Sequence, residues 1–142
     1  MNTTKQANKK HDLQSKVLIV DERKMLVLIK KREKLKYVLV GGFIEENESP
    51  RTALTREIFE ETGVKLSIVE FSFLSSIVLR REGKKKDITK YYFVYRKLND
   101  KKFINNEPHK FDGIDWVDWE EAIDYLNVYD REAVIKYFIN QN

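Results

Sequence analysis

Three glutamates, Glu57, Glu60 and Glu61, stand close together in a chain of 142 residues. If the segment is helical, a rotation of about 100° per residue places the three side chains within an arc of about 100° on one face. Carboxylates gathered in this way resist ionising together, and their pKa values rise unless a cation lies among them. Mg²⁺ and Mn²⁺ prefer such oxygen ligands. The cluster therefore indicates a divalent metal site, with a surface helix that carries an acidic stripe as the plainer alternative.

The segment that carries these glutamates has the start and stop signals of a helix from Ser49 to Thr62. Ser49 is a good N-cap, Pro50 suits the first helical position, and Gly63 suits the position after the last turn. The pair Gly41-Gly42 lies upstream, and glycine lets the backbone approach a ligand closely because it has no side chain. The sequence therefore predicts a capped helix that presents its carboxylates beside an open loop.

Arg56 is placed to hold acidic groups in position, since its guanidinium keeps its charge and cannot supply a proton at neutral pH. It lies four residues before Glu60, the spacing of a pair along one helix face. It could also hold Glu57 or the loop residue Glu48. In the same loop Asn47 is expected to adopt a left-handed backbone conformation, which asparagine tolerates.

The rest of the chain predicts the elements that would position this helix. Apolar runs at Val17–Val20 and Met25–Ile29, separated by a turn at 21–24, indicate a hairpin, and Tyr37–Val40 is a third strand that Gly41-Gly42 ends. After the helix we expect a β-rich stretch over 64–79 broken near Glu70, a hairpin tip at 80–87, a strand over 88–97, a polar loop over 98–113, a strand over 114–119, and helices over 120–126 and 130–139. This order predicts an α/β fold in which helices pack on the faces of a mixed sheet.

Composition limits the class of protein. The length and a hydrophobic content of 42% suit one domain with a real core, which we place at 14–142 after a flexible N-terminal segment, 1–13. No cysteine is present and the only histidines are His11 and His109, so thiolate and histidine-rich metal sites are excluded or disfavoured. The net charge of +4 suits an anionic partner without choosing one. With no signal peptide and no apolar run of about 20 residues, a cytoplasmic protein without membrane contact is expected.

The acidic segment also fits a known pattern. Gly42, five residues, Glu48, seven residues and then Arg56-Glu57-Ile58-Phe59-Glu60-Glu61-Thr62-Gly63-Val64 resembles the full Nudix box, with every fixed position filled. Val40 stands where many members have a proline before the paired glycines. The element order over nearly the whole chain after about residue 14 is similar to the Nudix fold. The resemblance implies an α/β/α sandwich with a mixed sheet and a catalytic loop–helix–loop.

The resemblance also implies the metal ligands. Glu60 and Glu61 would be the main ligands of Mg²⁺, or alternatively of Mn²⁺. Glu57 would be a further ligand or the general base. The carbonyl oxygen of Gly41 or Gly42 would complete the protein's share of the coordination.

Further residues acquire roles from the same resemblance. Arg56 and Glu48 would hold the loop–helix–loop together, with Gly63 ending the helix. The segment Glu107-Pro108-His109-Lys110 resembles a stretch of MutT-type nucleoside triphosphate diphosphatases, in which Glu107 would reach the metal and Lys110 would meet phosphate. Glu107 would then be the second choice for the general base. The run at 116–121 looks like the usual end of that stretch.

The family hydrolyses nucleoside diphosphates linked to another group, so the resemblance implies cleavage of a diphosphate linkage in a nucleotide. A nucleoside triphosphate cut to monophosphate and pyrophosphate, as in MutT-like enzymes, is the favoured substrate. Lys30, Lys31 and Arg32 could contact phosphates, although a solvated turn is the plainer interpretation. The side chains that could bind the nucleobase are Phe73, Tyr91, Phe93, Tyr129 and Asp130, although a place in the core or at the surface is the plainer interpretation of each.

Several alternatives stay open. Removal of diphosphate from an RNA 5′ end would suit the basic residues at 80–86, although a charged hairpin tip explains them as well. Hydrolysis of a sugar nucleotide or of ADP-ribose is a second alternative. ADP-ribose hydrolases of the family often have a proline about fifteen residues beyond the box, and the absence of one at that distance weakens the ADP-ribose alternative. Here the only prolines are Pro50 and Pro108. A non-catalytic module that senses a nucleotide is a further class, and a homodimer is an open alternative to a monomer.

Overall fold

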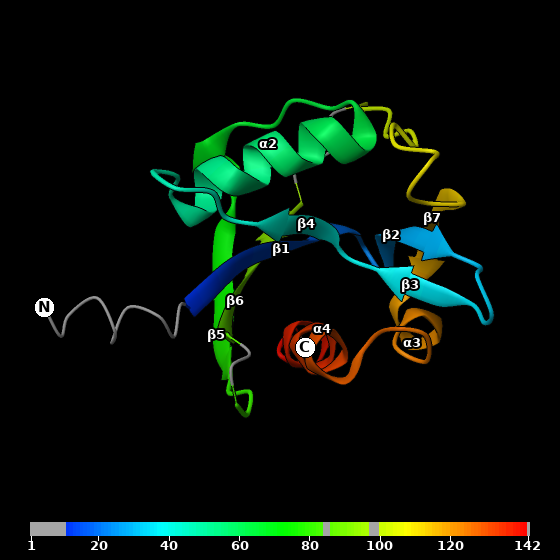
Figure 1. The fold of residues 1–142 in the computed structure, drawn as a ribbon. Coiled ribbons are helices and arrows are strands. Elements are labelled where there is room, and N and C mark those ends of the chain that lie inside the picture. Colours follow the sequence, from blue (N-terminus) through cyan, green and yellow to red (C-terminus); the bar gives the residue numbers. More distant parts are fainter. Residues whose placement is uncertain (1–10, 84–85, 97–99, 142) are drawn as a thin grey trace, which may run out of the picture.

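A seven-stranded mixed β-sheet forms the centre of the protein, which the computed structural model describes over residues 11–83, 86–96 and 100–141. Figure 1 shows helix α2 over one face of the sheet and helices α3 and α4 over the other. The predicted α/β class with a mixed sheet between helices is therefore confirmed. In the described residues no helix is long and apolar enough to span a bilayer.

The elements follow one another along the chain in the order β, α, β, α. They are β1 (His11–Asp21), β2 (Lys24–Lys30), β3 (Lys36–Val38), β4 (Val40–Phe43), α2 (Pro50–Thr62), the 3₁₀ turn η1 (Ile68–Glu70), β5 (Ser72–Leu79), β6 (Asp87–Tyr95), β7 (Gly113–Asp118), α3 (Trp119–Ala122) and α4 (Val128–Ile139). The main path of the sheet runs β3-β2-β1-β6-β5, while β4 pairs with β1 and β7 pairs with β2. The predicted hairpins β1–β2 and β5–β6 are both present and antiparallel.

Strand β1 organises the sheet because it changes partners along its length. One edge runs parallel to β6 over residues 11–19. On the other edge β4 pairs antiparallel with residues 14–17, and β2 takes over at Val20 and Asp21. This arrangement places Gly41 opposite Lys16 and Gly42 opposite Ser15. The two glycines therefore lie inside the sheet.

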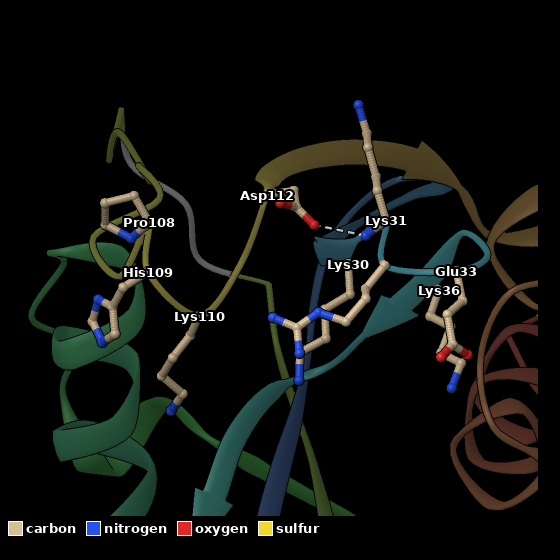
Figure 2. A pocket seen from close by; sticks show the side chains of 9 residues that line it. Lys30, Lys31, Glu33, Lys36, Pro108, His109, Lys110 and Asp112 are labelled. Carbon is tan, nitrogen blue, oxygen red and sulfur yellow. Dashed lines mark hydrogen bonds between the residues drawn. The ribbon is translucent and has the colours of Figure 1, made fainter.

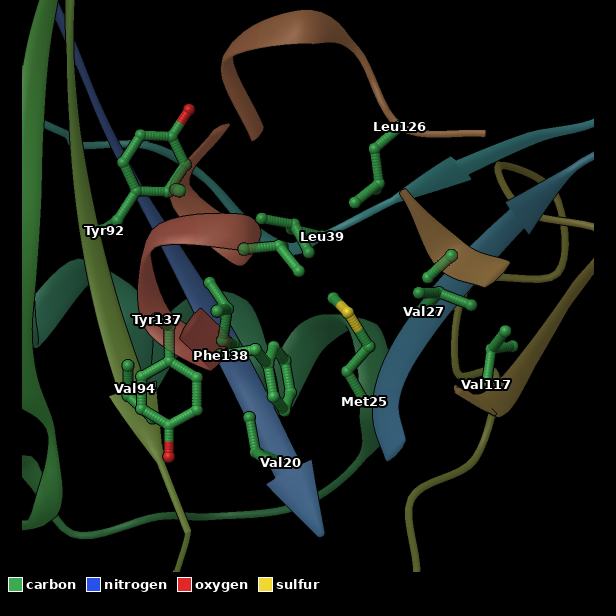
Figure 3. Packing of buried hydrophobic residues seen from close by; sticks show 14 residues of the cluster. Val20, Met25, Val27, Leu39, Tyr92, Val94, Val117, Leu126, Tyr137 and Phe138 are labelled. Atoms are coloured by element: carbon green, nitrogen blue, oxygen red, sulfur yellow. The ribbon is translucent and has the colours of Figure 1, made fainter. Parts of the chain in front are cut away.

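Alternation along β1 supplies both halves of the core. Val17 and Ile19 belong to the buried cluster on the α2 side, and Leu18 and Val20 belong to the cluster on the α4 side. Figure 3 shows the α4-side cluster, in which Phe138 reaches the sheet. A central strand buried on both faces carries apolar residues at successive positions, which explains its short apolar run.

Several strand boundaries differ from the sequence prediction. Strand β1 extends well beyond 17–20 and begins at His11, so residues 11–13 lie in the sheet and not in the predicted flexible segment; residues 1–10 lie outside the described residues. The strand expected at 37–40 is two strands, since the chain leaves β2 and joins β1 near Leu39, and Gly41-Gly42 continue β4 instead of ending it. Strand β6 ends at Tyr95, and Lys97 of the predicted strand is outside the described residues.

The C-terminal helices differ as well. Helix α3 covers only 119–122, because the chain then turns and the Tyr125 carbonyl accepts a hydrogen bond from the Tyr37 amide at 3.0 Å. Helix α4 begins two residues earlier than predicted. Its N-cap is Asn127, whose side-chain oxygen accepts from the amides of Tyr129 and Asp130 at 3.1 and 2.9 Å.

Candidate active site

Helix α2 has the caps that the sequence predicts. The Ser49 hydroxyl accepts a hydrogen bond from the Thr52 amide at 3.1 Å. At the other end Gly63 is left-handed, with φ of +76°, and its amide donates to the Phe59 carbonyl at 2.9 Å. The helix is anchored through Leu54 and Ile58, which are fully buried in the α2-side cluster. Both ends and one face of the helix are therefore fixed, which orients the acidic face.

Arg56 joins the helix to the loop before it. Its Nε and one terminal nitrogen donate to the two carboxylate oxygens of Glu48 at 2.7 and 3.0 Å, and that terminal nitrogen also donates to the Phe43 carbonyl at 3.0 Å. The other terminal nitrogen donates to Glu57 at 2.8 Å and to Glu60 at 3.2 Å. The hydrogen bond from Arg56 lowers the pKa of Glu48. Such a two-pronged, charge-assisted contact holds the loop against the helix.

The loop itself also follows the sequence prediction. Asn47 has φ of +66°, the left-handed conformation expected for it. The Glu45 amide donates to the Glu48 carboxylate at 2.8 Å, and the Glu48 amide donates to the Glu45 carbonyl at 3.1 Å. These local contacts close a tight acidic turn directly before the helix.

Glu61 is the most buried of the three clustered glutamates, with only 3% of its surface exposed. Its Oε1 accepts a hydrogen bond from the Gly41 amide at 2.9 Å. Burial raises the pKa of Glu61 to about 7, and burial also raises the pKa of Glu57. A Cβ at Gly42 would lie 2.2 Å from Glu57 Oε2, so a side chain there would displace the Glu57 carboxylate. The two glycines therefore bring backbone directly against the carboxylates.

A cavity of about 390 Å³ opens at this meeting point. The predicted site residues that line it are Lys30, Gly41, Gly42, Arg56, Glu57, Glu61 and Lys110. We call it the carboxylate cavity. Glu60 lies at its side with 47% of its side chain exposed, bound to Arg56.

Two polar residues of β1, Gln14 and Lys16, also line the carboxylate cavity and were not predicted. The Lys16 ammonium donates to the Leu39 carbonyl at 3.3 Å, and burial lowers the pKa of this lysine. One signal for them was present in the sequence, their position directly before the apolar run at 17–20. Strand β1 begins at His11 and so includes these polar residues, whereas the apolar pattern alone places the start of the strand at Val17.

The loop after β6 is fastened to the C-terminal end of α2. The Ile104 amide donates to the Thr62 carbonyl at 3.1 Å, and the Asn106 amide donates to the Glu61 carbonyl at 3.0 Å. The Asn106 side chain donates to the Glu60 carbonyl at 3.1 Å. These bonds satisfy carbonyl groups that a helix end leaves open. They also hold Glu107, the next residue, beside the acidic face.

The donors present fit a hard divalent cation. Glu57, Glu61, Gly41 and Gly42 meet at one cavity, where the carboxylates and the glycine carbonyl groups supply oxygen ligands. Glu107 Oε1 is buried without a hydrogen bond, and the Lys110 ammonium is 3.6 Å away. In the described part of the chain no three acidic or histidine side chains converge as a finished metal site. The carboxylates are bound within the protein instead, Glu57 and Glu60 by Arg56 and Glu61 by the Gly41 amide.

A larger cavity of about 710 Å³ lies next to the first and is lined mainly by cations. Figure 2 shows Lys30 and Lys110 on opposite sides of it. Both also line the carboxylate cavity, whereas Lys31 and Arg32 line only the larger one. The predicted phosphate-binding residues are thus divided between two neighbouring cavities.

The predicted base contacts lie elsewhere. Asp130 is 1% exposed; one carboxylate oxygen accepts from Lys90 at 3.2 Å and from Tyr92 at 2.6 Å, and the other accepts from Asn127 at 3.0 Å. Tyr129 is 39% exposed and lines a separate hollow against β5. The structure therefore gives Asp130 buried polar partners and places Tyr129 away from the carboxylate cavity.

The aromatic candidates are also separate from the carboxylate cavity. Phe93 is buried in the α2-side core, Tyr91 packs against that core, and Phe73 stands at the surface with its ring 5.6 Å from that of Phe93. None of the three is among the described residues that line the carboxylate cavity.

Comparison with known proteins agrees with the fold and the motif. A MutT-like protein of Streptomyces ambofaciens is 31% identical over 62 residues, which cover 44% of this chain and 40% of that protein, so the match spans about two fifths of the relative. A MutT NUDIX hydrolase from Burkholderia pseudomallei has a similar structure, with a TM-score of 0.72 at 20% identity over 89% of this chain and 98% of that one. The dihydroneopterin triphosphate pyrophosphohydrolase of E. coli gives a TM-score of 0.71 at 18% identity, over 90% and 95%.

The match to the family covers most of the chain. The NUDIX domain pattern extends over residues 10–138, which include the capped helix, the glycine pair and the loop that carries Glu107. The chain therefore belongs to the NUDIX family, hydrolases that act on diphosphate linkages, generally with a divalent metal ion.

Proposed function

We propose that the protein hydrolyses a nucleoside triphosphate to the monophosphate and pyrophosphate, with Mg²⁺ as the preferred metal and Mn²⁺ as a substitute. The observation that carries this proposal is the carboxylate cavity, where Glu57 and Glu61 meet the Gly41-Gly42 backbone and the lysines that line it. Carboxylates to hold a cation and ammonium groups to meet phosphate are the two requirements of this reaction. The resemblance of the acidic segment and of the Glu107–Lys110 segment to MutT-type nucleoside triphosphate diphosphatases supports the same substrate class.

In the proposed reaction, water attacks one phosphorus of the triphosphate, and the bond from that phosphorus to the bridging oxygen breaks. Glu60, Glu61 and a carbonyl of Gly41 or Gly42 would hold the metal, and Glu57 would be either a further ligand or the general base. When bound, the metal would neutralise the phosphate oxygens and stabilise the leaving group. Glu57 is the first choice to take the proton of the water, since it lines the carboxylate cavity and burial raises its pKa. Glu107 is the second.

The basic side chains at the carboxylate cavity would have two roles, phosphate binding by the lysines and positioning of the carboxylates by Arg56. Lys30 and Lys110 border the carboxylate cavity and would bind phosphate oxygens of the substrate. Each ammonium also lies over the face of Phe111, at 5.4 and 5.6 Å from the ring centre, which limits where it can point. Arg56 would act as a positioning residue through Glu48 and Glu57.

A substrate panel with Mg²⁺ tests the proposal, with phosphate and pyrophosphate measured separately. The panel contains ordinary and oxidised nucleoside triphosphates, sugar nucleotides, ADP-ribose, dinucleotides and 5′-triphosphorylated RNA, with EDTA as the control. We expect pyrophosphate from a nucleoside triphosphate and no product with EDTA. If nucleotides bind but every member stays intact, the protein is a nucleotide-sensing module and the proposal is wrong.

Asn106→Ala tests the contribution of the loop that carries Glu107. The change removes the donor to the Glu60 carbonyl and leaves the backbone bond to Glu61 in place. Because Asn106 would act through Glu107 and the helix, we expect kcat to fall about tenfold with a smaller change in KM, the size typical of residues that support metal ligands. The unfolding free energy should fall by about 1 kcal/mol.

The matched control is Asn140→Ala at the end of α4, which should leave kcat unchanged. Asn106→Asp keeps the size of the side chain but replaces its amide donor with a carboxylate, and should resemble Asn106→Ala. Wild-type kcat in Asn106→Ala, together with reduced stability, would show that the loop is only structural.

A further inference from the structure

The larger cavity concentrates the positive charge of the protein. Its described lining holds five cations, Lys30, Lys31, Arg32, Lys36 and Lys110, and two carboxylates, Glu33 and Asp112. Five minus two gives a local charge of +3, against +4 for the whole chain. A concave surface with this excess focuses a positive potential and attracts anions. We call it the basic cavity.

One of the two carboxylates is already engaged. Asp112 Oδ2 accepts a hydrogen bond from the Lys31 amide at 2.7 Å, which Figure 2 shows, and the Asp112 amide donates to the Ile29 carbonyl at 2.8 Å. These bonds join the loop before β7 to the end of β2. They fix the frame of the basic cavity, and they direct Asp112 Oδ2 to a backbone amide and not to the ammonium group of Lys31.

The basic cavity adjoins the carboxylate cavity along one border. Lys30 and Lys110 line both, and Phe111 lies beneath both ammonium groups. A ligand whose terminal phosphates occupy the carboxylate cavity would therefore reach the basic cavity directly. A nucleoside triphosphate has all its phosphates at the reacting end, and so leaves the cations beyond Lys30 and Lys110 without a phosphate to bind. A nucleic-acid strand carries one further phosphate for every nucleotide.

We propose that the basic cavity binds the backbone phosphates of a single-stranded RNA whose 5′-terminal triphosphate occupies the carboxylate cavity. This inference rests on the proposed function and makes it more specific. Arg32 and Lys36 would contact the phosphates that follow the first nucleotide. The hydrophilic lining suits a backbone, which is recognised by charge and not by base sequence.

The other basic segment of the chain is less suited to this role. At the β5–β6 hairpin, Arg80 pairs with Asp87 at 3.6 Å, and the Arg81 side chain donates to the Lys86 carbonyl at 2.6 Å. Lys84 and Lys85 lie outside the described residues. Neither arginine lines the carboxylate cavity, so a strand bound there has no described path to the reacting groups.

The test compares two substrates in three proteins. The substrates are a 5′-triphosphorylated hexaribonucleotide and the free nucleoside triphosphate of its first base. The proteins are the wild type, Arg32→Gln/Lys36→Gln, and the matched control Arg80→Gln/Arg81→Gln, which removes the same charge at the hairpin. We expect the RNA-to-nucleotide ratio of kcat/KM to be about tenfold in the wild type and the control, and to fall toward one in the cavity variant.

Binding gives a second readout that does not need turnover. Fluorescence anisotropy of the labelled RNA is followed against salt concentration in the Glu61→Gln background, with a 5′-hydroxyl RNA of the same sequence alongside. Each phosphate contact contributes about 0.7 to the slope of log affinity against log salt for a single strand, so losing two cations should lower the slope by about 1.4. The 5′-hydroxyl RNA should bind more weakly than the triphosphorylated one.

The outcomes separate the two proposals. If the nucleoside triphosphate is hydrolysed but the ratio and the salt slope are the same in the cavity variant, the RNA inference is wrong and the proposed function stands. If the RNA-to-nucleotide ratio of kcat/KM falls in the hairpin control and not in the cavity variant, the inference is also wrong. If neither substrate is hydrolysed in Mg²⁺, the proposed function itself fails. Circular dichroism confirms that each variant is folded.

Discussion

Glu61→Gln is expected to lower kcat by about 10²- to 10⁴-fold while the fold stays intact. This corresponds to about 3 to 5 kcal/mol of transition-state stabilisation. The glutamine keeps an oxygen to accept the Gly41 amide, so the buried hydrogen bond survives. It removes the negative charge that would hold the cation at the innermost point of the carboxylate cavity. Glu61 is the most buried of the clustered glutamates, with 3% of its surface exposed, so its position is fixed more firmly than that of Glu60.

The measurements are the steady-state rate with Mg²⁺ and the thermal midpoint. The matched control is Glu46→Gln, which removes one charge from an exposed residue in the adjoining loop and should retain full turnover. The thermal midpoint of Glu61→Gln should equal or exceed that of the wild type, because a buried carboxylate with a raised pKa is costly to ionise. Normal turnover in Glu61→Gln would remove Glu61 from the reaction.

Gly41→Ala is expected to destabilise the protein by about 3 to 5 kcal/mol, the largest stability effect that we predict for a single substitution. Gly41 has φ of +133°, which an alanine adopts only with strain. The added Cβ would lie 2.1 Å from the Ser15 carbonyl oxygen and 2.9 Å from the Lys16 Cα. Both are backbone atoms of β1, the strand at the centre of the sheet, so neither can move aside as a side chain would.

Urea unfolding followed by circular dichroism measures the effect. Gly83→Ala is the matched control, since Gly83 also has a positive φ, +68°, but among the described residues beyond its chain neighbours no atom lies within 4 Å of the added Cβ. It should cost only about 1 kcal/mol, the penalty of the backbone conformation itself. Equal losses in the two variants would mean that the contact with β1 is unimportant, and that the backbone conformation alone explains the glycine.

Short-range signals explain what the sequence predicted well. The caps at Ser49 and Gly63, the left-handed Asn47 and the pairing of Arg56 with Glu48 all lie within about fifteen residues of one another. Their contacts depend on helix geometry and on turn chemistry, which local residue types determine. The acidic face could be predicted for the same reason, because helical spacing alone places Glu57, Glu60 and Glu61 on one side of α2. The mixed sheet between helices also followed from the order of apolar runs.

Long-range pairing decided the rest. The sequence alone determined the acidic helix, its caps and the class of chemistry, because these are properties of one continuous segment. Only the tertiary structure decided that β1 runs through polar residues to place Lys16 at the carboxylate cavity. It also decided that Asp130 has buried polar partners from β6, and that the cations at 30–36 line a separate basic cavity with Lys110. Those contacts join residues about 40 to 80 positions apart, and their energies come from burial and charge that no local pattern records.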